Sequence, residues 1–152
     1  MQFHFLHSDV QSTQPSWLIP SNASLLRQIV ALYQHEGWWH APLDTDALLL
    51  NLINNSHCFL IAVSDSREVV AMGRAISDRT SDAYIQDVAV RFDHRKSGIG
   101  TAIITRIIKR LQSDGITWIG LISEKDSHSF YQKIGFTPLS GAIPMIYRLS
   151  EN

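Results

Sequence analysis

Residues 84–111, YIQDVAVRFDHRKSGIGTAIITRIIKRL, contain the pattern best suited to bind a ligand. Arg95, Gly98 and Gly100 form an R-x-x-G-x-G turn between an apolar strand and an amphipathic helix. Glycines let the backbone approach a ligand closely, and the first N–H groups of a helix have no partner within it. The turn therefore predicts an anion site, with a pyrophosphate as the expected anion. The alternative is that the glycines only permit a tight strand-to-helix turn.

Two other phosphate-binding folds fit the sequence poorly. A dinucleotide-binding fold places its glycines after the first strand, and an acidic residue follows about 20 residues later at a strand end. Here several predicted strands precede the turn, and Asp114 falls at a helix end. A P-loop requires G-K-[ST], which the chain lacks.

A second motif, FYQKIGF at residues 130–136, follows the glycine turn, and the apolar run VAV at residues 88–90 precedes it. The ordered combination of strand, glycine turn, helix, strand, helix and FY-x-x-x-GF resembles the GNAT superfamily of acetyl-coenzyme A-dependent N-acetyltransferases. The resemblance covers the C-terminal two thirds of the chain well and the rest loosely. It implies acetyl-coenzyme A as cosubstrate and direct attack by an amine, with no covalent enzyme intermediate.

The resemblance also implies which residues bind coenzyme A. The amides of the turn would bind its diphosphate, with charge added by Arg95 or Lys96, and the preceding strand would lie against the acetyl group and pantetheine arm. Many family members have asparagine seven residues before the motif tyrosine, where this chain has Glu124, so contacts with pantetheine or adenosine are expected from Ser127 or Ser129. The expected cofactor-binding residues are Val88, Ala89, Val90, Arg95, Lys96, Ser97, Gly98, Ile99, Gly100, Thr101 and Ser127.

Asp87 and Tyr131 are the predicted catalytic residues. An alkylammonium ion with a pKa near ~10 must lose a proton before it attacks, which costs about 4 kcal/mol at neutral pH. Asp87 interrupts an apolar strand and would accept that proton directly or through water; alternatively, it accepts backbone hydrogen bonds or pairs with Arg74. The amide of Val88 would stabilise the developing oxyanion. Tyr131 occupies the family's tyrosine position and would protonate the departing thiolate, unless it is a packing residue like Phe130.

The acceptor site is predicted from the same resemblance. The loop between the first two helices lines the acceptor pocket in the resembling fold, and here it contains Trp38 and Trp39. Their rings can stack on an arylalkylamine or attract its ammonium group, although they can equally be core or interface residues. The stretches GRAISDRTSDAYIQDVAV and IPMIYRL resemble the plastid and bacterial branch that includes serotonin N-acetyltransferases. This favours a small-molecule primary amine, with Ser77 near the pocket unless it only forms a turn.

Two other functions remain open from the sequence. One is acetylation of a protein or peptide, which would need an open groove. The other is a coenzyme A-binding sensor that keeps the nucleotide site but has little turnover. Asp87 and Tyr131 favour the enzyme over the sensor.

Hydrophobic spacing predicts the elements that position these residues. We expect a strand over residues 3–7, a helix from Pro20-Ser21-Asn22 to Gly37, and a second helix after Pro42 with Asp44 or Thr45 as cap. CFLIAV, VVAMGRAI and AYIQDVAV would form an antiparallel meander, followed by a helix from Ile99 to Asp114-Gly115. ITWIGLI would be a buried strand parallel to AYIQDVAV, because a helix-length crossover separates them. A short helix over residues 127–134 and a hairpin of GFTPL with PMIYRL would close the chain.

The predicted fold class is therefore α+β, with a GNAT-like fold. Its central, mostly antiparallel twisted sheet would have six to seven strands with one parallel pair, flanked by about four helices. The 152 residues, 45% of them apolar, fit one acetyltransferase domain over residues 1–152.

Composition limits the expected partners and location. A net charge of -1 gives no general attraction to nucleic acid or acidic lipid. No apolar run reaches the ~18 residues of a membrane span, and the N-terminus lacks the pattern of a secretion signal, so we expect a cytoplasmic protein. Dimers are common in the resembling family, so a homodimer is compatible with the sequence.

The residues with affinity for metals are dispersed. The seven histidines fall in different predicted elements, so no metal site is expected. The single cysteine, Cys58, excludes an internal disulfide framework and suits a buried strand position.

Overall fold

The computed structural model describes residues 3–8, 22–40 and 44–147. They fall into two compact units that meet in the sequence after Leu121. The first unit contains a sheet with helices, and the second contains one short helix. The prediction of a single domain over residues 1–152 stays a prediction.

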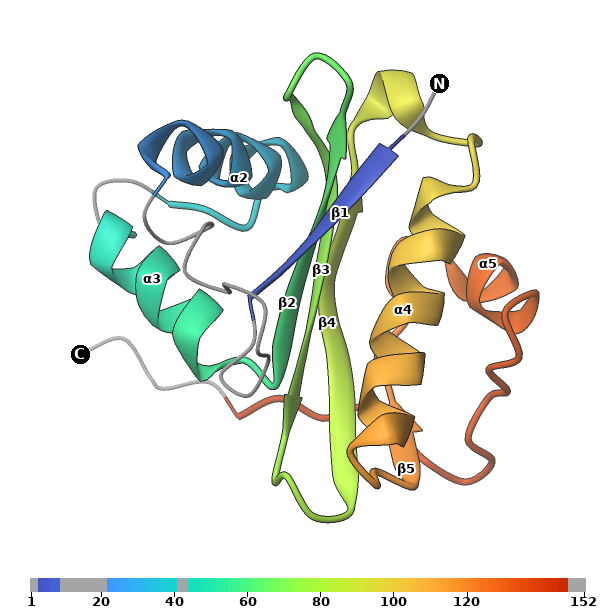
Figure 1. Cartoon of the computed structure of the whole chain (residues 1–152). Helices are drawn as coiled ribbons and strands as arrows, with labels where there is room; N and C mark the ends of the chain where they lie inside the picture. The colour runs from blue at the N-terminus through green and yellow to red at the C-terminus, as the bar shows by residue number, and fades with distance from the viewer. Residues whose placement is uncertain (1–2, 9–21, 41–43, 148–152) are drawn as a thin grey trace. The chain divides into compact units, whose positions relative to one another are not determined.

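The first unit is built on a five-stranded sheet in the order β1-β2-β3-β4-β5 (Figure 1). The first four strands pair antiparallel, and β5 pairs parallel with β4. The predicted meander and the single parallel pair are thus confirmed. The strands are β1 (Phe3–Ser8), β2 (Cys58–Ser64), β3 (Val69–Ser77), β4 (Asp82–Val90) and β5 (Trp118–Gly120).

The helices of this unit cover both faces of the sheet. Helices α2 (Ala23–Glu36) and α3 (Asp46–Asn55) lie on one face, and α4 (Ile99–Ser113) lies on the other (Figure 1). A short 3-10 helix, η1 (Phe92–His94), precedes α4. Together with α5 (His128–Gln132) of the second unit, the described residues contain four α-helices, as predicted.

The helix ends follow local sequence signals. The Asn22 side chain accepts hydrogen bonds from the amides of Ser24 and Leu25 at the start of α2, and Gly37 ends that helix with a φ of 77°. Thr45 caps α3 by accepting from the amide of Leu48. These caps satisfy backbone groups that a helix end leaves unpaired, so the predicted boundaries are confirmed.

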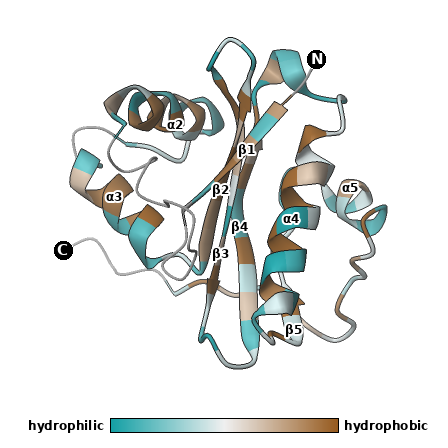
Figure 2. Ribbon diagram, viewed as in Figure 1, coloured by the Kyte–Doolittle hydropathy of each residue, from teal (hydrophilic) through white to brown (hydrophobic). Residues whose placement is uncertain are grey.

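The core lies on both faces of the sheet. Figure 2 shows β2 and β3 as hydrophobic along much of their length, and every residue of β2 is buried. On the α4 face the contact is so close that a Cβ added at Gly73 of β3 would lie 2.7 Å from Ile103 Cγ2. Helix α4 therefore packs directly on the backbone of β3.

Two predictions for the C-terminal half need correction. ITWIGLI forms a strand over only Trp118–Gly120, and Trp118 is 39% exposed, so the prediction of a seven-residue buried strand is wrong. The reason is that β5 is an edge strand, with no strand on its outer side in the part of the chain described. Helix α5 is shorter than the predicted range 127–134.

The predicted closing hairpin is not confirmed. The predicted count of six to seven strands is therefore not confirmed either. Residues 135–147 contain no strand, while residues 148–149 of PMIYRL lie outside the described residues. Pro138 and Pro144 lie within the two predicted strands, and proline cannot donate a backbone hydrogen bond to a ladder. The described sheet therefore has five strands.

Candidate functional site

Strand β4 is irregular at the point where it carries Asp87. The pairing of β3 with β4 shifts register between Met72 and Arg74, so Asp87 and Val88 both face the single residue Gly73. Two residues opposite one define a β-bulge, which re-aims side chains and interrupts the ladder. Asp87 also has a φ of 53°, a left-handed conformation that is uncommon for a residue other than glycine.

Two side chains from other elements hold the Asp87 carboxylate. Its Oδ2 accepts a hydrogen bond from the Tyr33 hydroxyl at 2.8 Å and another from Arg74 Nε at 2.5 Å. Arg74 Nη2 also donates to Gln86 Oε1 at 3.0 Å. Oδ1 has no hydrogen-bond partner among the described residues. The predicted pairing of Asp87 with Arg74 is thus confirmed, and one carboxylate oxygen is left for a ligand.

Tyr33 and the two tryptophans form an aromatic group beside this carboxylate. Tyr33 is 3% exposed, and burial together with the charge of Asp87 raises its pKa far above the usual range. Its hydroxyl is therefore protonated and donates to Asp87. Trp38 and Trp39 pack on the Tyr33 ring, with centroid distances of 6.3 Å and 5.9 Å, and are partly buried against the core. Their packing role is clear, while their role toward an acceptor stays a prediction.

The outer edge of β4 is unpaired beside the bulge. Strand β5 pairs with β4 only at Asp82, Ala83 and Tyr84. From residue 85 to Val90 this edge faces no other strand in the part of the molecule that is described. Free backbone groups on a sheet edge can pair with an extended ligand. The predicted ligand-binding run 88–90 lies on this edge.

The glycine turn leads from this edge to the first amides of α4. Gly98 is the N-cap of α4, with a φ of 84°, and no side chain of the described residues caps the helix there. A Cβ added at Gly98 would meet no atom within 4 Å. The first turn of α4 contains no acidic residue, which favours an anion beside Ile99, Gly100 and Thr101. Uncapped amides beside open space are what the predicted anion site requires.

The two predicted cations of the turn are placed differently. Arg95 Nε donates to the carbonyl oxygen of Val90 at 3.0 Å, and its Nη2 contacts Glu36 Oε1 at 2.7 Å. Arg95 therefore joins the turn to β4 and to α2. Lys96 is exposed and has no ion pair or hydrogen bond to the described residues. Of the two side chains, Lys96 is the one free to meet an incoming phosphate.

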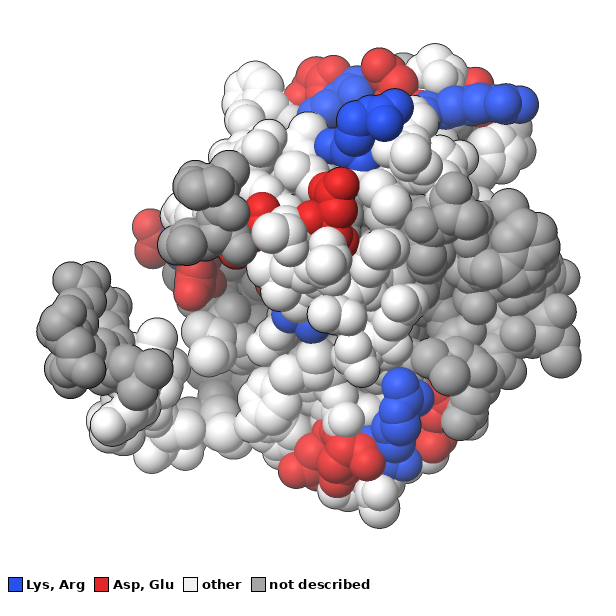
Figure 3. Space-filling model, turned by 90° about the vertical axis from the view of Figure 1, so that its left-hand side faces the viewer, with Lys and Arg blue, Asp and Glu red and all other residues white. Residues whose placement is uncertain are grey.

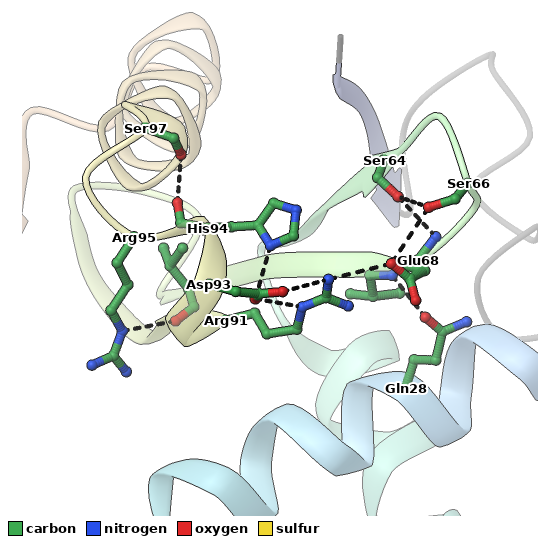
Figure 4. A network of polar contacts seen from close by, with 11 residues as sticks. Gln28, Ser64, Ser66, Glu68, Arg91, Asp93, His94, Arg95 and Ser97 are labelled. Atoms are coloured by element: carbon green, nitrogen blue, oxygen red, sulfur yellow. Dashed lines mark hydrogen bonds and ion pairs between the residues drawn. The ribbon is translucent and has the colours of Figure 1, made fainter. Parts of the chain in front are cut away.

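A polar network fixes the segment before Gly98 (Figure 4). The Ser97 hydroxyl donates to the carbonyl oxygen of His94, whose ring Nδ1 lies 2.9 Å from Asp93 Oδ1. Arg91 lies between Asp93 and Glu68, at 2.8 Å and 3.2 Å.

On the face of α2 and α3, positive and negative side chains adjoin one another instead of gathering into one basic surface (Figure 3).

Ser77 is the last residue of β3, beyond the bulge at Gly73, and has a different set of partners. Its Oγ is 2.5 Å from His57 Nδ1, and His57 Nε2 is 2.7 Å from Asp114 Oδ2. Arg110 Nε also donates to Asp114 Oδ2, at 2.6 Å. Although burial opposes it, the hydrogen bonds from His57 and Arg110 hold the pKa of Asp114 below its usual value. The structure thus places Ser77 with the C-terminal end of α4 and not with Asp87.

The second unit contains the two remaining predicted residues. Ser127 is the N-cap of α5, and its Oγ lies 3.0 Å from Ser123 Oγ. The Tyr131 ring packs edge-on against Phe130 and Phe136, at 5.0 Å and 6.0 Å. Burial raises the pKa of Tyr131, so its hydroxyl is protonated at neutral pH, as a proton donor must be. The functional roles of Ser127 and Tyr131 stay predictions.

Sequence reasoning missed two residues of this region, Tyr33 and Glu36. Tyr33 is a buried residue of α2, and hydrophobic spacing places it on the apolar face of the helix without indicating its hydroxyl contact. A buried tyrosine hydroxyl needs a polar partner, and that requirement was the available signal. Glu36 has no comparable signal, because its partner Arg95 is 59 positions away.

Other chemistries receive no support from the described residues. Within them no three His, Cys, Asp or Glu side chains gather as a metal site would require. No described helix has both the length and the hydropathy needed to cross a bilayer. Cys58 is buried, as predicted, and burial raises the pKa of its thiol to about 12.

Comparison with known proteins identifies the family of the chain. Residues 23–136 match the family model Acetyltransferase (GNAT) family. An uncharacterised N-acetyltransferase of Pyropia yezoensis is 33% identical over 121 residues, which are 78% of this chain and 68% of that protein. The chain belongs to the GNAT acetyltransferase family.

Two other relatives match over smaller shares of this chain. Serotonin N-acetyltransferase 2, chloroplastic, of Oryza sativa is 32% identical over 75 residues, which are 49% of this chain and 38% of that protein. A match to an uncharacterised N-acetyltransferase of Porphyra purpurea, at 31% identity, covers 73% of this chain and 64% of that protein. The chain thus spans between about a third and two thirds of the length of these relatives.

Solved structures share the fold. An aminoglycoside acetyltransferase from a soil metagenomic sample aligns over 97% of this chain and 97% of its own, with a TM-score of 0.73 and 18% identity. Glucosamine-6-phosphate N-acetyltransferase of Arabidopsis thaliana aligns over 97% of this chain and 100% of its own, with a TM-score of 0.70 and 12% identity. The predicted GNAT-like α+β fold is therefore confirmed at the level of its architecture.

Proposed function

We propose that this protein is an acetyl-coenzyme A-dependent N-acetyltransferase that acetylates a primary amine of a small molecule by direct attack. The observation that carries the proposal is a continuous stretch of backbone from the unpaired edge of β4, at the Asp87 bulge, to the uncapped first amides of α4. This stretch offers sites for a thioester, an extended arm and a diphosphate in that order. Membership of the family supports the same order.

The residues present fit acetyl-coenzyme A. The amides of Ile99, Gly100 and Thr101 and the side chain of Lys96 would hold the diphosphate, because they are uncapped or unpaired among the described residues. The edge of β4 at residues 88–90 would hold the pantetheine arm by backbone hydrogen bonds. Acetyl-coenzyme A supplies an acetyl group activated as a thioester.

Three groups of the chain would transfer protons or stabilise the charge that develops during the reaction. Asp87 Oδ1, which lacks a partner in the described structure, would bind the acceptor ammonium and take its proton directly or through water. The amide of Val88, in the bulge, would stabilise the negative charge that develops on the carbonyl oxygen. Tyr131, whose pKa is raised by burial, would donate a proton to the departing sulfur.

Two observations favour a small amine with an aromatic group. Trp38 and Trp39 pack around Tyr33, whose hydroxyl contacts Asp87, so aromatic surface lies close to the proposed ammonium site. A relative is named serotonin N-acetyltransferase 2. A protein acceptor is the second candidate, because another relative, of Glycine max, is named histone acetyltransferase and is 32% identical over 113 residues.

The proposal is tested by acetyl-coenzyme A consumption in the presence of arylalkylamines, polyamines, amino sugars, amino acids and lysine-containing peptides. We expect fastest turnover with an arylalkylamine. Fastest turnover with peptides would replace the small-molecule acceptor by a protein acceptor. Tight calorimetric binding of acetyl-coenzyme A without turnover of any acceptor would support a sensor and overturn the enzyme.

The role of Tyr131 has its own test. Tyr131→Phe removes only the hydroxyl, so we expect turnover to fall by about 10- to 100-fold while acetyl-coenzyme A affinity is kept. Phe130 is the neighbouring ring of the same motif, and a Phe130→Tyr/Tyr131→Phe double variant, which moves the hydroxyl by one position, should not recover turnover if the acid acts from position 131. Wild-type turnover of Tyr131→Phe would remove the proposed acid.

A further inference from the structure

The bulge at Asp87 needs support from side chains. Its φ of 53° is unfavourable for an L-residue with a Cβ, although aspartate tolerates this region better than most. A strained backbone persists only where the surrounding structure over-determines it. The contacts of Asp87 with α2 and β3 are the available cause.

Three elements converge on a single oxygen atom. Asp87 Oδ2 from β4 accepts from Tyr33 of α2 at 2.8 Å and from Arg74 of β3 at 2.5 Å. The Arg74 and Asp87 side chains are 12% and 24% exposed, and Tyr33 is 3% exposed. Trp38 and Trp39 pack on the Tyr33 ring, so its hydroxyl is already ordered. A hydrogen bond made by a pre-ordered group loses little side-chain entropy.

Tyr33 determines that Asp87 uses only Oδ2 for its contacts within the protein and leaves Oδ1 unbound in the described structure. An arginine can bind both oxygens of a carboxylate with two parallel N–H donors. In this protein Tyr33 and Arg74 Nε share Oδ2, and Arg74 Nη2 is engaged by Gln86. Without the tyrosine hydroxyl, the carboxylate is free to turn toward a two-oxygen contact with Arg74. Oδ1 would then be held by the guanidinium group and would no longer be directed at an amine.

We propose that Tyr33 is a positioning residue that, together with Arg74, fixes the Asp87 carboxylate and the bulge of β4, so that Oδ1 stays directed at the acceptor amine. The inference rests on the proposed function for the use of Oδ1, but the fixing of the bulge does not depend on it. It also gives α2 a role in catalysis, because the helix that precedes Trp38 and Trp39 sets the direction of the base.

The test compares Tyr33→Phe with the control Tyr84→Phe. Tyr84 lies on the same strand as Asp87 but is 44% exposed and packs on Trp118. For Tyr33→Phe we expect amide hydrogen exchange at residues 86–90 to accelerate by about 10-fold or more, because a hydrogen bond to a charged group is lost. We expect kcat to fall by a similar factor, a higher KM for the amine and an unchanged Kd for acetyl-coenzyme A. Tyr84→Phe should match the wild type in all four measurements.

A double-mutant cycle with Asp87→Gly separates positioning from general stabilisation. Glycine accepts a φ of 53° without a side chain, so it keeps the backbone conformation and removes the partner of Tyr33. In the Asp87→Gly background, Tyr33→Phe should change neither hydrogen exchange nor kcat further. An equal effect in both backgrounds, or no effect of Tyr33→Phe in the wild type, would overturn the inference. Because hydrogen exchange needs no substrate, a failure to find any acceptor amine would count against the proposed function and leave this test intact.

Discussion

The two ends of helix α4 are built in opposite ways. At its N-terminal end Gly98 has no side-chain cap and is exposed, and the space where its Cβ would lie is open. At its C-terminal end Asp114 binds both Arg110 and the buried His57, which in turn contacts Ser77. One end thus leaves backbone donors for a ligand, while the other satisfies its polar groups with the protein's own side chains. Only the open end has the properties of a binding site.

The chain offers a matched pair of positions for testing this difference. Gly98 and Gly115 flank the same helix with φ values of 84° and 83°, and an added Cβ meets no atom within 4 Å at either. A side chain should therefore strain the backbone equally at both, by roughly 1–2 kcal/mol. If the two substitutions change the Kd of the ligand differently, backbone strain is not the cause, and the difference reports where the ligand binds.

The largest expected effect is the loss of acetyl-coenzyme A affinity in Gly98→Val. The added isopropyl group would occupy the open space through which the diphosphate of the proposed function would approach the amides of Ile99 and Gly100. We expect Kd measured by calorimetry to rise by about 100-fold, or roughly 2.7 kcal/mol. Gly115→Val should lower the thermal stability similarly and leave Kd unchanged. Equal Kd values for the two variants would show that the open end of α4 is not the diphosphate site.

The second prediction concerns the closed end. Asp114→Ala leaves the His57 ring nitrogen, in a side chain only 3% exposed, without its acceptor. An unsatisfied buried donor costs about 2 kcal/mol, so we expect denaturant unfolding to show a loss of that size. The acetyl-coenzyme A Kd of the folded protein should not change. A variant as stable as the wild type would mean that water replaces the carboxylate.

The Asp114 contribution should also depend on pH in a defined direction. Because its pKa is lower in the folded protein than the usual ~3.9, its ionised form stabilises the fold. This stabilisation is complete above the usual value and is lost as the pH falls through the folded value. The stability difference between wild type and Asp114→Ala should therefore be constant from pH 6 to 5 and shrink progressively below about pH 4. A difference that grows on acidification would contradict this assignment.

Local signals made much of this fold predictable. Asn22 and Thr45 accept hydrogen bonds from nearby amides, and the backbone at Gly37 donates to nearby carbonyl oxygens, so their effect on α2 and α3 can be recognised in the sequence. The Arg74–Asp87 pair was also accessible, because neighbouring strands of a meander place such residues opposite each other. The edge position of β5 could not be predicted, because the hydrophobic run ITWIGLI does not specify how many of its residues will pair with a neighbouring strand.

Contacts between distant elements account for most of what the sequence did not reveal. Tyr33 and Asp87 are 54 positions apart, and their contact depends on how α2 rotates as it packs on the sheet. The periodicity of α2 defines its buried face but not the strand residue that its tyrosine meets. Ser77 shows a second limit. Its place in a family-like stretch predicts a position near the acceptor pocket, and this stays a prediction, while its contact with His57, which in turn contacts Asp114, could not be inferred from the sequence.

A smaller effect is expected at the open end from Lys96→Ala. Lys96 is exposed and unpaired among the described residues, so its charge should add to diphosphate binding. An exposed charge contributes little, and we expect Kd to rise by roughly 3- to 10-fold at low salt and less at high salt. Lys109→Ala, on the exposed side of α4, is the matched control and should leave Kd unchanged. A salt-independent effect of Lys96→Ala would indicate that the lysine acts on the shape of the turn and not through its charge.

The smallest expected effect is that of Ser77→Ala, which decides to which region Ser77 belongs. In the structure its Oγ contacts His57 Nδ1 and accepts from the amide of Arg79 at 3.0 Å. A carboxylate can only accept, so His57 Nε2 donates to Asp114, and Ser77 Oγ supplies the hydrogen-bond partner of the other ring nitrogen, Nδ1. Losing that bond should cost about 0.5–1 kcal/mol of unfolding free energy, while the KM of the acceptor amine stays constant. A raised KM with unchanged stability would instead return Ser77 to the acceptor site, and the closed end of α4 would then be functional as well.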